Sequence, residues 1–175
     1  YLSYCLSVIK DVFPEIPRNS LPTYIHIMNQ TGLSYNYMRL TDLAMNYYTK
    51  ALDIAQKNNL NEEEAILCNN IASIFQTQKK YDESDSLFKR AIIINEELKV
   101  PQRLFVNYNN LSVNYAHKKD YNKALEYAFL AVHQLDAARD SDMIILMQRN
   151  IGSIYLKQKE PRMALQLLKQ VEDYQ

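Results

Sequence analysis

Hydrophobic positions along the chain follow a helical spacing, and the same arrangement returns every 40 residues. In one copy two apolar runs take the three- and four-residue steps of a helix face. These runs are Ile66, Leu67, Ile71, Ile74 and Phe75, and then Leu87, Phe88, Ala91 and Ile92. The pattern predicts pairs of amphipathic helices and therefore an all-α fold.

Aligning the chain with itself at this period gives four copies in which residues of one size recur in columns. A column of small residues precedes an aromatic column by three positions, and two further small columns lie seven positions apart. The columns are Gly32, Ala72, Ser112, Gly152; Tyr35, Phe75, Tyr115, Tyr155; Ala44, Ser84, Ala124, Ala164; and Ala51, Ala91, Ala131, Val171. A fixed internal period is the signature of stacked repeats, so the columns predict a solenoid of antiparallel helix pairs.

Both glycines of the chain, Gly32 and Gly152, stand in the first small column. A glycine inside a helix costs about 1 kcal/mol relative to alanine. We therefore expect both to mark sites of close helix–helix packing. Most tyrosines fall on core columns or at helix starts, whereas Tyr4, Tyr47 and Tyr48 are expected to be partly exposed.

The repeat boundaries predicted from caps and prolines are 25–60, 61–99, 101–139 and 141–175, within a single array over 1–175. Asn61 is expected to cap a helix with an acidic first turn, Glu62–Glu64, and Pro161 to stand near a helix start. Residues 1–13 are predicted to form one helix of a preceding pair, and 14–22 a linker. The chain begins with Tyr1, and we expect it to be part of a longer protein.

Composition argues against several classes of function. Twenty basic and twenty acidic residues give no net charge, and nucleic-acid binding needs a basic surplus. There is no apolar run long enough to span a membrane. The cysteines, Cys5 and Cys68, are predicted to be small buried residues. The three histidines share no metal spacing, and no phosphate loop or nucleophile pattern occurs, so we expect no cofactor and no catalytic residues.

The column pattern resembles the tetratricopeptide repeat. The second copy reads Ile71-Ala72, Phe75, Tyr81, Ser84, Phe88 and Ala91; the third reads Leu111-Ser112, Tyr115, Tyr121, Ala124, Ala128 and Ala131; the last reads Ile151-Gly152, Tyr155, Pro161, Ala164, Leu168 and Val171. The resemblance covers about 25–173. It implies a right-handed superhelical solenoid of about four repeats plus one N-terminal helix, whose first helices line a concave groove for peptides or partner proteins.

Two departures from that family pattern stand out. The first copy has Thr31 and Thr41 in place of the aliphatic residue and the tyrosine, which makes it the weakest copy. The period is 40 residues where the family's usual period is 34. The longer period resembles the subclass that includes kinesin-light-chain-like and cell-polarity adaptor arrays.

A ladder of polar side chains shares the period without sharing the packing role. Because a row of amides can both donate to and accept from an extended backbone, we predict that this ladder binds a peptide. The alternative is that the amides satisfy neighbouring helix ends or face solvent. The predicted binding residues are Asn29, Gln30, Asn69, Asn70, Asn109, Asn110, Arg149 and Asn150, together with Gln76, His117 and Lys157.

Basic residues are placed in two ways. On the groove face only Arg149 and Lys157 could hold a carboxylate-ended ligand, and both belong to the last copy. Others recur at the turns within pairs, as in Arg39, Lys79 and Lys119. We interpret these as complementing helix C-terminal dipoles rather than as a rail for an acidic partner.

The main hypothesis is therefore a non-catalytic scaffold that binds a protein or an extended peptide, without direct nucleic-acid contact or a membrane segment. One alternative is a sensory or regulatory region of a larger bacterial signalling protein or transcriptional regulator, because the composition is typical of AT-rich bacterial genes. A second is an array that self-associates through its C-terminal end, where Leu165, Leu168 and Val171 would be uncovered. The compartment is unknown; the cytoplasm is favoured, with the periplasm open for a segment of a larger protein.

Overall fold

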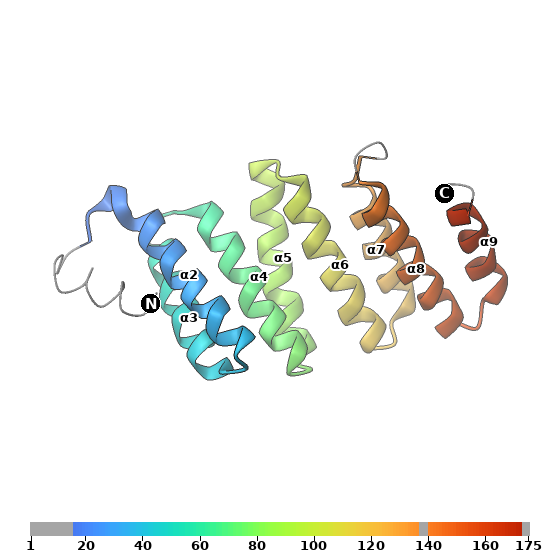
Figure 1. The fold of residues 1–175 in the computed structure, drawn as a ribbon, viewed down its shortest axis with the longest axis horizontal. Coiled ribbons are helices and arrows are strands. Elements are labelled where there is room, and N and C mark those ends of the chain that lie inside the picture. Colours follow the sequence, from blue (N-terminus) through green and yellow to red (C-terminus); the bar gives the residue numbers. More distant parts are fainter. Residues whose placement is uncertain (1–15, 137–139, 173–175) are drawn as a thin grey trace. The chain divides into compact units, whose positions relative to one another are not determined.

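A computed structural model describes residues 16–136 and 140–172, with side chains to Gln166, and is built entirely from helices over that part (Figure 1). A short 3-10 turn, Arg18–Ser20, precedes the first helix. The α-helices are α2 (Leu21–Tyr37), α3 (Thr41–Lys57), α4 (Asn61–Thr77), α5 (Tyr81–Leu98), α6 (Pro101–His117), α7 (Tyr121–Val132), α8 (Ser141–Lys157) and α9 (Pro161–Glu172). The all-α prediction is confirmed. The helix predicted over 1–13 lies outside the described residues.

The chain divides into two compact units, residues 1–94 and 95–175, so that the boundary falls inside α5. In the first unit, buried side chains of α2, α3 and α4 form one core that includes Ile25, Tyr48, Ala51, Leu67 and Ile74. In the second unit, α6 packs on α7 and α8 packs on α9.

Turns of three residues set the repeat length. In four of them the N–H of the last turn residue donates to the carbonyl of the aromatic column: Leu40 to Tyr35, Lys80 to Phe75, Asp120 to Tyr115 and Glu160 to Tyr155, each at 2.9 Å. The same four residues accept the first bond of the next helix through their own carbonyls, as Ala44 N–H to Leu40 at 3.1 Å. One residue thus ends one helix and starts the next, which keeps each connection short.

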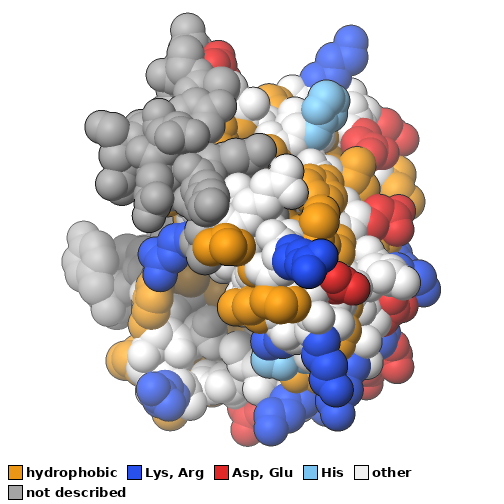
Figure 2. Space-filling view, turned by 90° about the vertical axis from the view of Figure 1, so that its right-hand side faces the viewer, with side chains coloured by type: hydrophobic (Ala, Val, Ile, Leu, Met, Phe, Trp, Pro, Cys, Tyr) orange, Lys and Arg blue, Asp and Glu red, His pale blue; other side chains and the backbone are white. Residues whose placement is uncertain are grey.

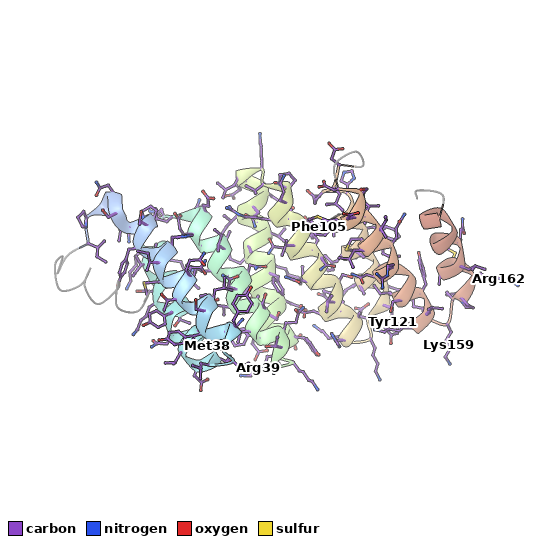
Figure 3. The ribbon with its side chains drawn as sticks, in the orientation of Figure 1. Met38, Arg39, Phe105, Tyr121, Lys159 and Arg162 are labelled. Atoms are coloured by element: carbon purple, nitrogen blue, oxygen red, sulfur yellow. The ribbon has the colours of Figure 1, made fainter. Side chains whose placement is uncertain are left out.

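The middle residue of the three-residue turns, and Lys99 in the two-residue connection after α5, adopt a left-handed conformation. Among the described residues, positive φ occurs outside glycine at Arg39 (61°), Asn59 (55°), Lys79 (61°), Lys99 (55°), Lys119 (63°) and Lys159 (64°). Arg39 and Lys159 are labelled at their turns in Figure 3. The helix C-terminus favours a cation there, while the backbone conformation favours glycine. The recurring basic residues at the turns therefore carry backbone strain.

We expect Lys79→Gly and Lys119→Gly each to raise the free energy of unfolding by about 0.5–1 kcal/mol, since glycine adopts positive φ without the Cβ clash. The matched control is Lys50→Gly in the middle of α3, which should lower it by about 1 kcal/mol because glycine weakens a helix interior. Urea denaturation measures all three. A loss of stability in Lys79→Gly as large as that in Lys50→Gly would contradict this account.

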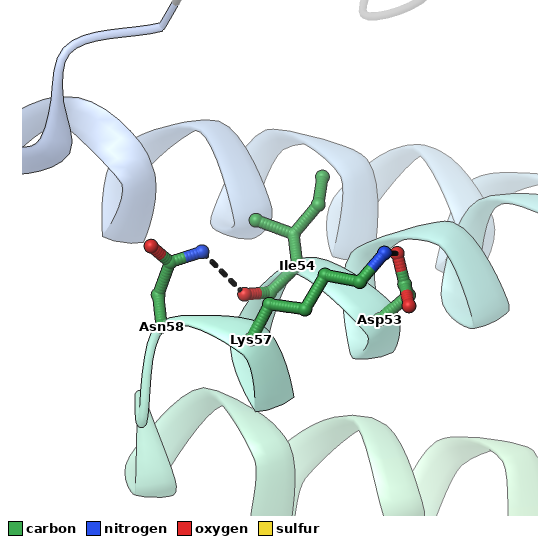
Figure 4. Close-up of polar contacts among 4 residues, drawn as sticks. All are labelled: Asp53, Ile54, Lys57 and Asn58. Atoms are coloured by element: carbon green, nitrogen blue, oxygen red, sulfur yellow. Dashed lines mark hydrogen bonds and ion pairs between the residues drawn. The ribbon is translucent and has the colours of Figure 1, made fainter.

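The C-terminus of α3 shows how side chains complete a helix end (Figure 4). Asn58 Nδ2 donates to the Ile54 carbonyl at 2.8 Å, which satisfies an acceptor that the helix itself leaves open. Lys57 Nζ lies 2.7 Å from Asp53 Oδ2 across one turn. Both side chains of this ion pair are largely exposed, so its contribution to stability is small.

The described residues of the small columns are buried where two helices of a pair meet. Ser84 Oγ donates to the Ala72 carbonyl at 2.9 Å, and Ser112 Oγ donates to the Ala124 carbonyl at 2.8 Å. The hydroxyl therefore comes from the second helix in one pair and from the first helix in the next. A buried hydroxyl needs a partner, and the carbonyl of the facing small residue supplies it.

The two glycines differ, contrary to the sequence expectation. A Cβ on Gly32 would lie 2.6 Å from Tyr48 Cε1, so close packing is confirmed there. A Cβ on Gly152 would meet no described atom within 4 Å, so the described residues show no such close contact at this buried glycine. Tyr48 is itself 1% exposed, which corrects its expected exposure, because its ring fills the space above Gly32. Tyr47 is half-buried and stacks on Tyr35 at 5.6 Å between centroids.

Two helix starts also differ from the sequence prediction. Asn61 is the first residue of α4 and not its cap; Leu60 holds that position without a side-chain bond. The first described α-helix, α2, begins at Leu21, so the predicted linker 14–22 ends inside a helix, and Pro22 lies in its first turn, where it costs no hydrogen bond. Pro161 begins α9, as predicted.

Candidate binding faces

Three ladder amides of the first unit form a hydrogen-bonded chain. Asn69 Nδ2 donates to Asn70 Oδ1 at 3.3 Å, and Asn70 Nδ2 donates to Asn29 Oδ1 at 2.7 Å. The second bond links α4 to α2, whose residues are 41 positions apart in sequence. All three side chains are half-buried. The sequence predicts that these amides bind a peptide, or else that they satisfy neighbouring helix ends or face solvent. In the structure the amides of this unit also form hydrogen bonds with one another.

A cleft of about 220 Å³ lies between α2 and α4 in the same unit. Its polar walls are His26, Asn29, Glu62 and Glu63, and apolar side chains of both helices complete it. Of the predicted residues in this unit, Asn29 lines this cleft. None of the described residues that line it is a lysine or an arginine.

The second unit has its own cleft, of about 120 Å³, between α6 and α8. Four predicted residues meet there: Asn109 and His117 from α6, and Asn150 and Lys157 from α8. Val113 and Ile154 are apolar parts of its lining, and none of its described lining residues carries a carboxylate. Asn109 and Asn150 come from adjacent ladder columns, whereas His117 and Lys157 occupy the same column, 40 positions apart, and these two basic side chains also meet in the cleft.

The remaining predicted residues lie outside the linings of these two clefts. Gln30, Gln76 and Asn110 are half-buried on α2, α4 and α6, and Arg149 is exposed on α8. Since Arg149 does not line the cleft that holds Lys157, the two basic groups proposed for a carboxylate are not brought together in it. The binding role of all these residues stays a prediction.

Buried polar groups were missed by the sequence analysis. Glu64, considered only as part of a helix start, is 3% exposed, and its Oε1 accepts from Arg90 Nε at 3.0 Å and from Gln56 Nε2 at 3.2 Å. A hydrophobic column interrupted by a charged residue is the sequence signal for such a group. Arg90 and Gln56 stand on the neighbouring second helices, so the pairing ties α4 to α3 and α5 of its own unit.

Cys68 is buried, as predicted. Burial, with a smaller contribution from the Glu64 carboxylate, raises the pKa of its thiol to about 11. The thiol is therefore protonated near neutral pH and is a packing group rather than a nucleophile.

Over the described parts of the chain, no group of three or more His, Cys, Asp or Glu side chains is arranged to hold a metal ion. Within the same residues, no helix has the length and apolar character needed to cross a membrane.

Two family models, both described as tetratricopeptide repeat, match residues 25–58 and 62–128, together more than half of the chain. The chain is a tetratricopeptide repeat protein. The matched ranges carry the ladder from Asn29 to Asn110 and exclude the last helix pair, α8 and α9. No curated protein matches the sequence.

Solved structures show the same fold at low sequence identity. BtubC (BKLC) from P. vanneervenii is 23% identical over 91% of this chain, with a TM-score of 0.79. RapI in its apo form is 19% identical over 97%, with a TM-score of 0.83. The TPR-like repeats of a putative kinesin light chain from Podosopora anserina are 16% identical over 98%, with a TM-score of 0.77.

Coverage of those structures is unequal. This tetratricopeptide repeat protein spans 66% of the BtubC chain and 60% of the RapI chain, but 82% of the kinesin light chain repeats. The fold and the family together support a protein-interaction scaffold. Tetratricopeptide repeats are typically non-catalytic.

Proposed function

We propose that this protein binds an extended segment of a partner protein along the first helices of its repeats, α2 and α4 in one unit and α6 and α8 in the other, and that it has no catalytic activity of its own. The observation that carries the proposal is the position of ladder amides in clefts: Asn29 lines the first, and Asn109 and Asn150 line the second. In both units the amides belong to first helices.

The chemistry of these faces suits a peptide backbone. An extended segment carries N–H and C=O groups that need partners, and a side-chain amide supplies both a donor and an acceptor. The apolar linings, such as Ile66 in the first cleft and Val113 in the second, can cover part of a side chain. The long period further favours the subclass that resembles kinesin-light-chain arrays.

An array of unstructured peptides of varied sequence tests the proposal. We expect the double variant Asn29→Ala, Asn109→Ala to weaken the best binders about tenfold or more, because both amides line the clefts, each lost amide contact removes on the order of 1 kcal/mol, and 1.4 kcal/mol is a factor of ten. Circular dichroism checks that the variant remains helical.

The matched control is the double variant Asn46→Ala, Asn122→Ala, which removes exposed amides from the second helices α3 and α7. Its binding should equal that of the unmodified protein. Equal loss in both double variants, or no loss in the ladder variant, would sink the ladder proposal.

A second candidate is a sensory or regulatory region of a larger protein. One solved structure with a similar fold, from Pyrococcus horikoshii, is a signal transduction ATPase with a tetratricopeptide repeat sensor, and this similarity supports the candidate. The present chain covers 33% of that protein at a TM-score of 0.54. The domain order of the full-length gene decides this candidate, and a gene without a further domain would contradict it.

A third candidate is self-association through the C-terminal end. Leu165 of α9 is 55% exposed. The face drawn in Figure 2 shows hydrophobic side chains among charged ones. The side chains of Leu168 and Val171 lie outside the described residues. A monomer in light scattering at high protein concentration would contradict this candidate.

A further inference from the structure

The turns that join the two helices of a pair differ in charge between the two units. In the first unit, segments 37–43 and 77–83 each hold equal numbers of basic and acidic residues. In the second unit, segments 117–123 and 157–163 each hold three lysine or arginine residues against one acidic residue, a net charge of +2. The six cations are Lys118, Lys119, Lys123, Lys157, Lys159 and Arg162. A chain without net charge therefore concentrates positive charge at two of its turns.

These two turns lie side by side in the second unit. Gln158 Nε2, in the turn between α8 and α9, donates to Asn122 Oδ1 at the start of α7 at 2.9 Å. Figure 3 labels Lys159 and Arg162 at the second of these turns, and Figure 2 shows Lys and Arg side chains gathered in the lower part of the face it draws. The hydrogen bond therefore joins the six cations into one surface, which we call the cationic edge.

Helix dipoles explain only part of the cationic edge. A cation is favoured in the last turn of a helix and disfavoured in the first. Lys123 and Arg162 lie in the first turns of α7 and α9, and neither turn has an acidic residue. The equivalent first turns of α3 and α5 in the other unit carry Asp42, and Asp82 with Glu83. The second unit therefore has basic residues where the dipole favours acidic ones, which indicates a role other than helix stability.

Most of the cationic edge is not engaged within the protein. Lys118 and Lys123 Nζ lie over the Tyr115 ring, 5.0 and 5.3 Å from its centroid, and Lys123 also pairs with Asp120 at 3.5 Å. The other four cations are exposed and make no side-chain hydrogen bond or ion pair with any described residue: Lys119, Lys157, Lys159 and Arg162. These four side chains are available to an anionic partner.

Exposed apolar side chains accompany these four cations. Leu156 is 57% exposed beside the turn between α8 and α9, and Met163 is 43% exposed in the first turn of α9. A soluble acidic polypeptide would use the charges and leave both apolar side chains in water. The surface of an anionic bilayer offers charged headgroups in one plane, with acyl chains beneath them. The combination of cationic and apolar groups therefore favours a membrane surface.

We propose that the cationic edge of the second unit docks on the surface of an anionic lipid bilayer. Its lysine and arginine side chains contact the headgroups, and Leu156 and Met163 reach the boundary with the acyl chains. Of the six cations, Lys157 alone also lines the second cleft. The inference therefore goes beyond the proposed function, which concerns the faces of the first helices.

Sedimentation of the whole chain with lipid vesicles tests the proposal. We expect binding to phosphatidylcholine vesicles that contain about one third phosphatidylserine, loss of that binding at about 1 M salt, and little binding to phosphatidylcholine alone. The double variant Lys119→Gln, Lys159→Gln should bind about tenfold or more weakly, because each lysine near an anionic surface contributes about a factor of five. Circular dichroism checks that the variant remains helical.

The matched control is the double variant Arg39→Gln, Lys79→Gln, which changes the same turn position in the first unit. Because those turns have no excess charge, its binding should stay within about twofold of the unmodified chain. Equal weakening in both double variants, or unchanged binding of the Lys119→Gln, Lys159→Gln variant, would overturn the inference.

Tryptophan, which the chain lacks, reports which surface meets the vesicle. In Met163→Trp the emission should move to shorter wavelength with phosphatidylserine vesicles, and in Phe129→Trp, at an exposed position late in α7, it should not. Leu156→Trp serves should Met163→Trp lose its fold. Absence of a shift at the cationic edge would overturn the inference. Tighter binding to soluble polyglutamate than to the vesicles would assign this edge to an acidic polypeptide and overturn it as well.

Discussion

Asn107→Leu alone is expected to lower the free energy of unfolding by about 2–3 kcal/mol, and adding Asn95→Ala to recover most of that loss. Both asparagines are 1% exposed, and Asn95 Nδ2 donates to Asn107 Oδ1 at 2.9 Å. Asn95 Oδ1 has no hydrogen-bond partner. Removing the Asn107 side chain would also take this hydrogen-bond partner from Asn95 Nδ2, so that both polar atoms of the buried Asn95 amide would lack one.

The repeat itself supplies the replacement pair. Forty residues earlier the same two positions are Ala55 and Leu67, both fully buried in the core of the first unit. The double variant Asn95→Ala, Asn107→Leu copies that pair and removes both hydrogen-bonding side chains together, which can leave the free energy of unfolding nearly unchanged. Removing one asparagine alone leaves the other buried without its partner. Alanine and leucine together also fill a volume similar to that of two asparagines.

A double-mutant cycle by urea denaturation measures the coupling. We expect the double variant to lie within about 1 kcal/mol of the unmodified chain, which gives a coupling energy of about 2 kcal/mol between the sites. Additive losses, with the double variant the least stable of the four proteins, would show that the asparagine pair is not replaceable by the packing of the preceding repeat.

Gly32→Ala and Gly152→Ala are expected to change stability in opposite directions, although they are the same substitution in the same column. At Gly32 the new methyl group would lie 2.6 Å from the Tyr48 ring, and Tyr48 is buried on all sides, so a loss of about 2–3 kcal/mol follows from overpacking. At Gly152 the methyl group meets no described atom, and the better helix propensity of alanine should add about 1 kcal/mol.

Thermal unfolding followed by circular dichroism compares the two variants with the unmodified chain. The variant Gly32→Ala with Tyr48→Leu provides the control, since a smaller side chain at 48 should reduce the loss caused by the methyl group. A stabilised Gly32→Ala, or a Gly152→Ala as damaging as Gly32→Ala, would refute the packing described for the column.

Much of the fold could be predicted from the sequence because the columns encode contacts that every repeat makes. Buried Ala44, Ala51 and Phe88 fall where the period puts them, and the helices α4, α6 and α8 begin at 61, 101 and 141. The predictions that were wrong concern single positions. Asn61 has the residue type of a cap and is followed by glutamates, but the helix starts one residue earlier than this pattern predicts: Leu60 holds the cap position, and its carbonyl accepts the first helical bond from Glu64 N–H at 2.9 Å.

The candidate site was less accessible from the sequence. Periodicity placed the amides on the first helices but could not reveal that Asn70 bonds to Asn29, because that contact depends on side-chain orientation across two helices. Nor could it separate Gly32 from Gly152, because the space above each is set by residues of another helix: Tyr48 fills it in one repeat and no described side chain does in the other.

The most direct test of the central claim, that partner segments bind along the first helices through the ladder, is chemical-shift mapping with the strongest peptide from the array. The account predicts that shifts concentrate on side-chain amides of Asn29 in the first unit, or of Asn109 and Asn150 in the second, with neighbouring signals of α2 and α4 or of α6 and α8. Shifts confined to the outer surfaces of α3, α5 and α7, at exposed residues such as Leu43, Ile93 and Phe129, with the ladder amides unchanged, would contradict it.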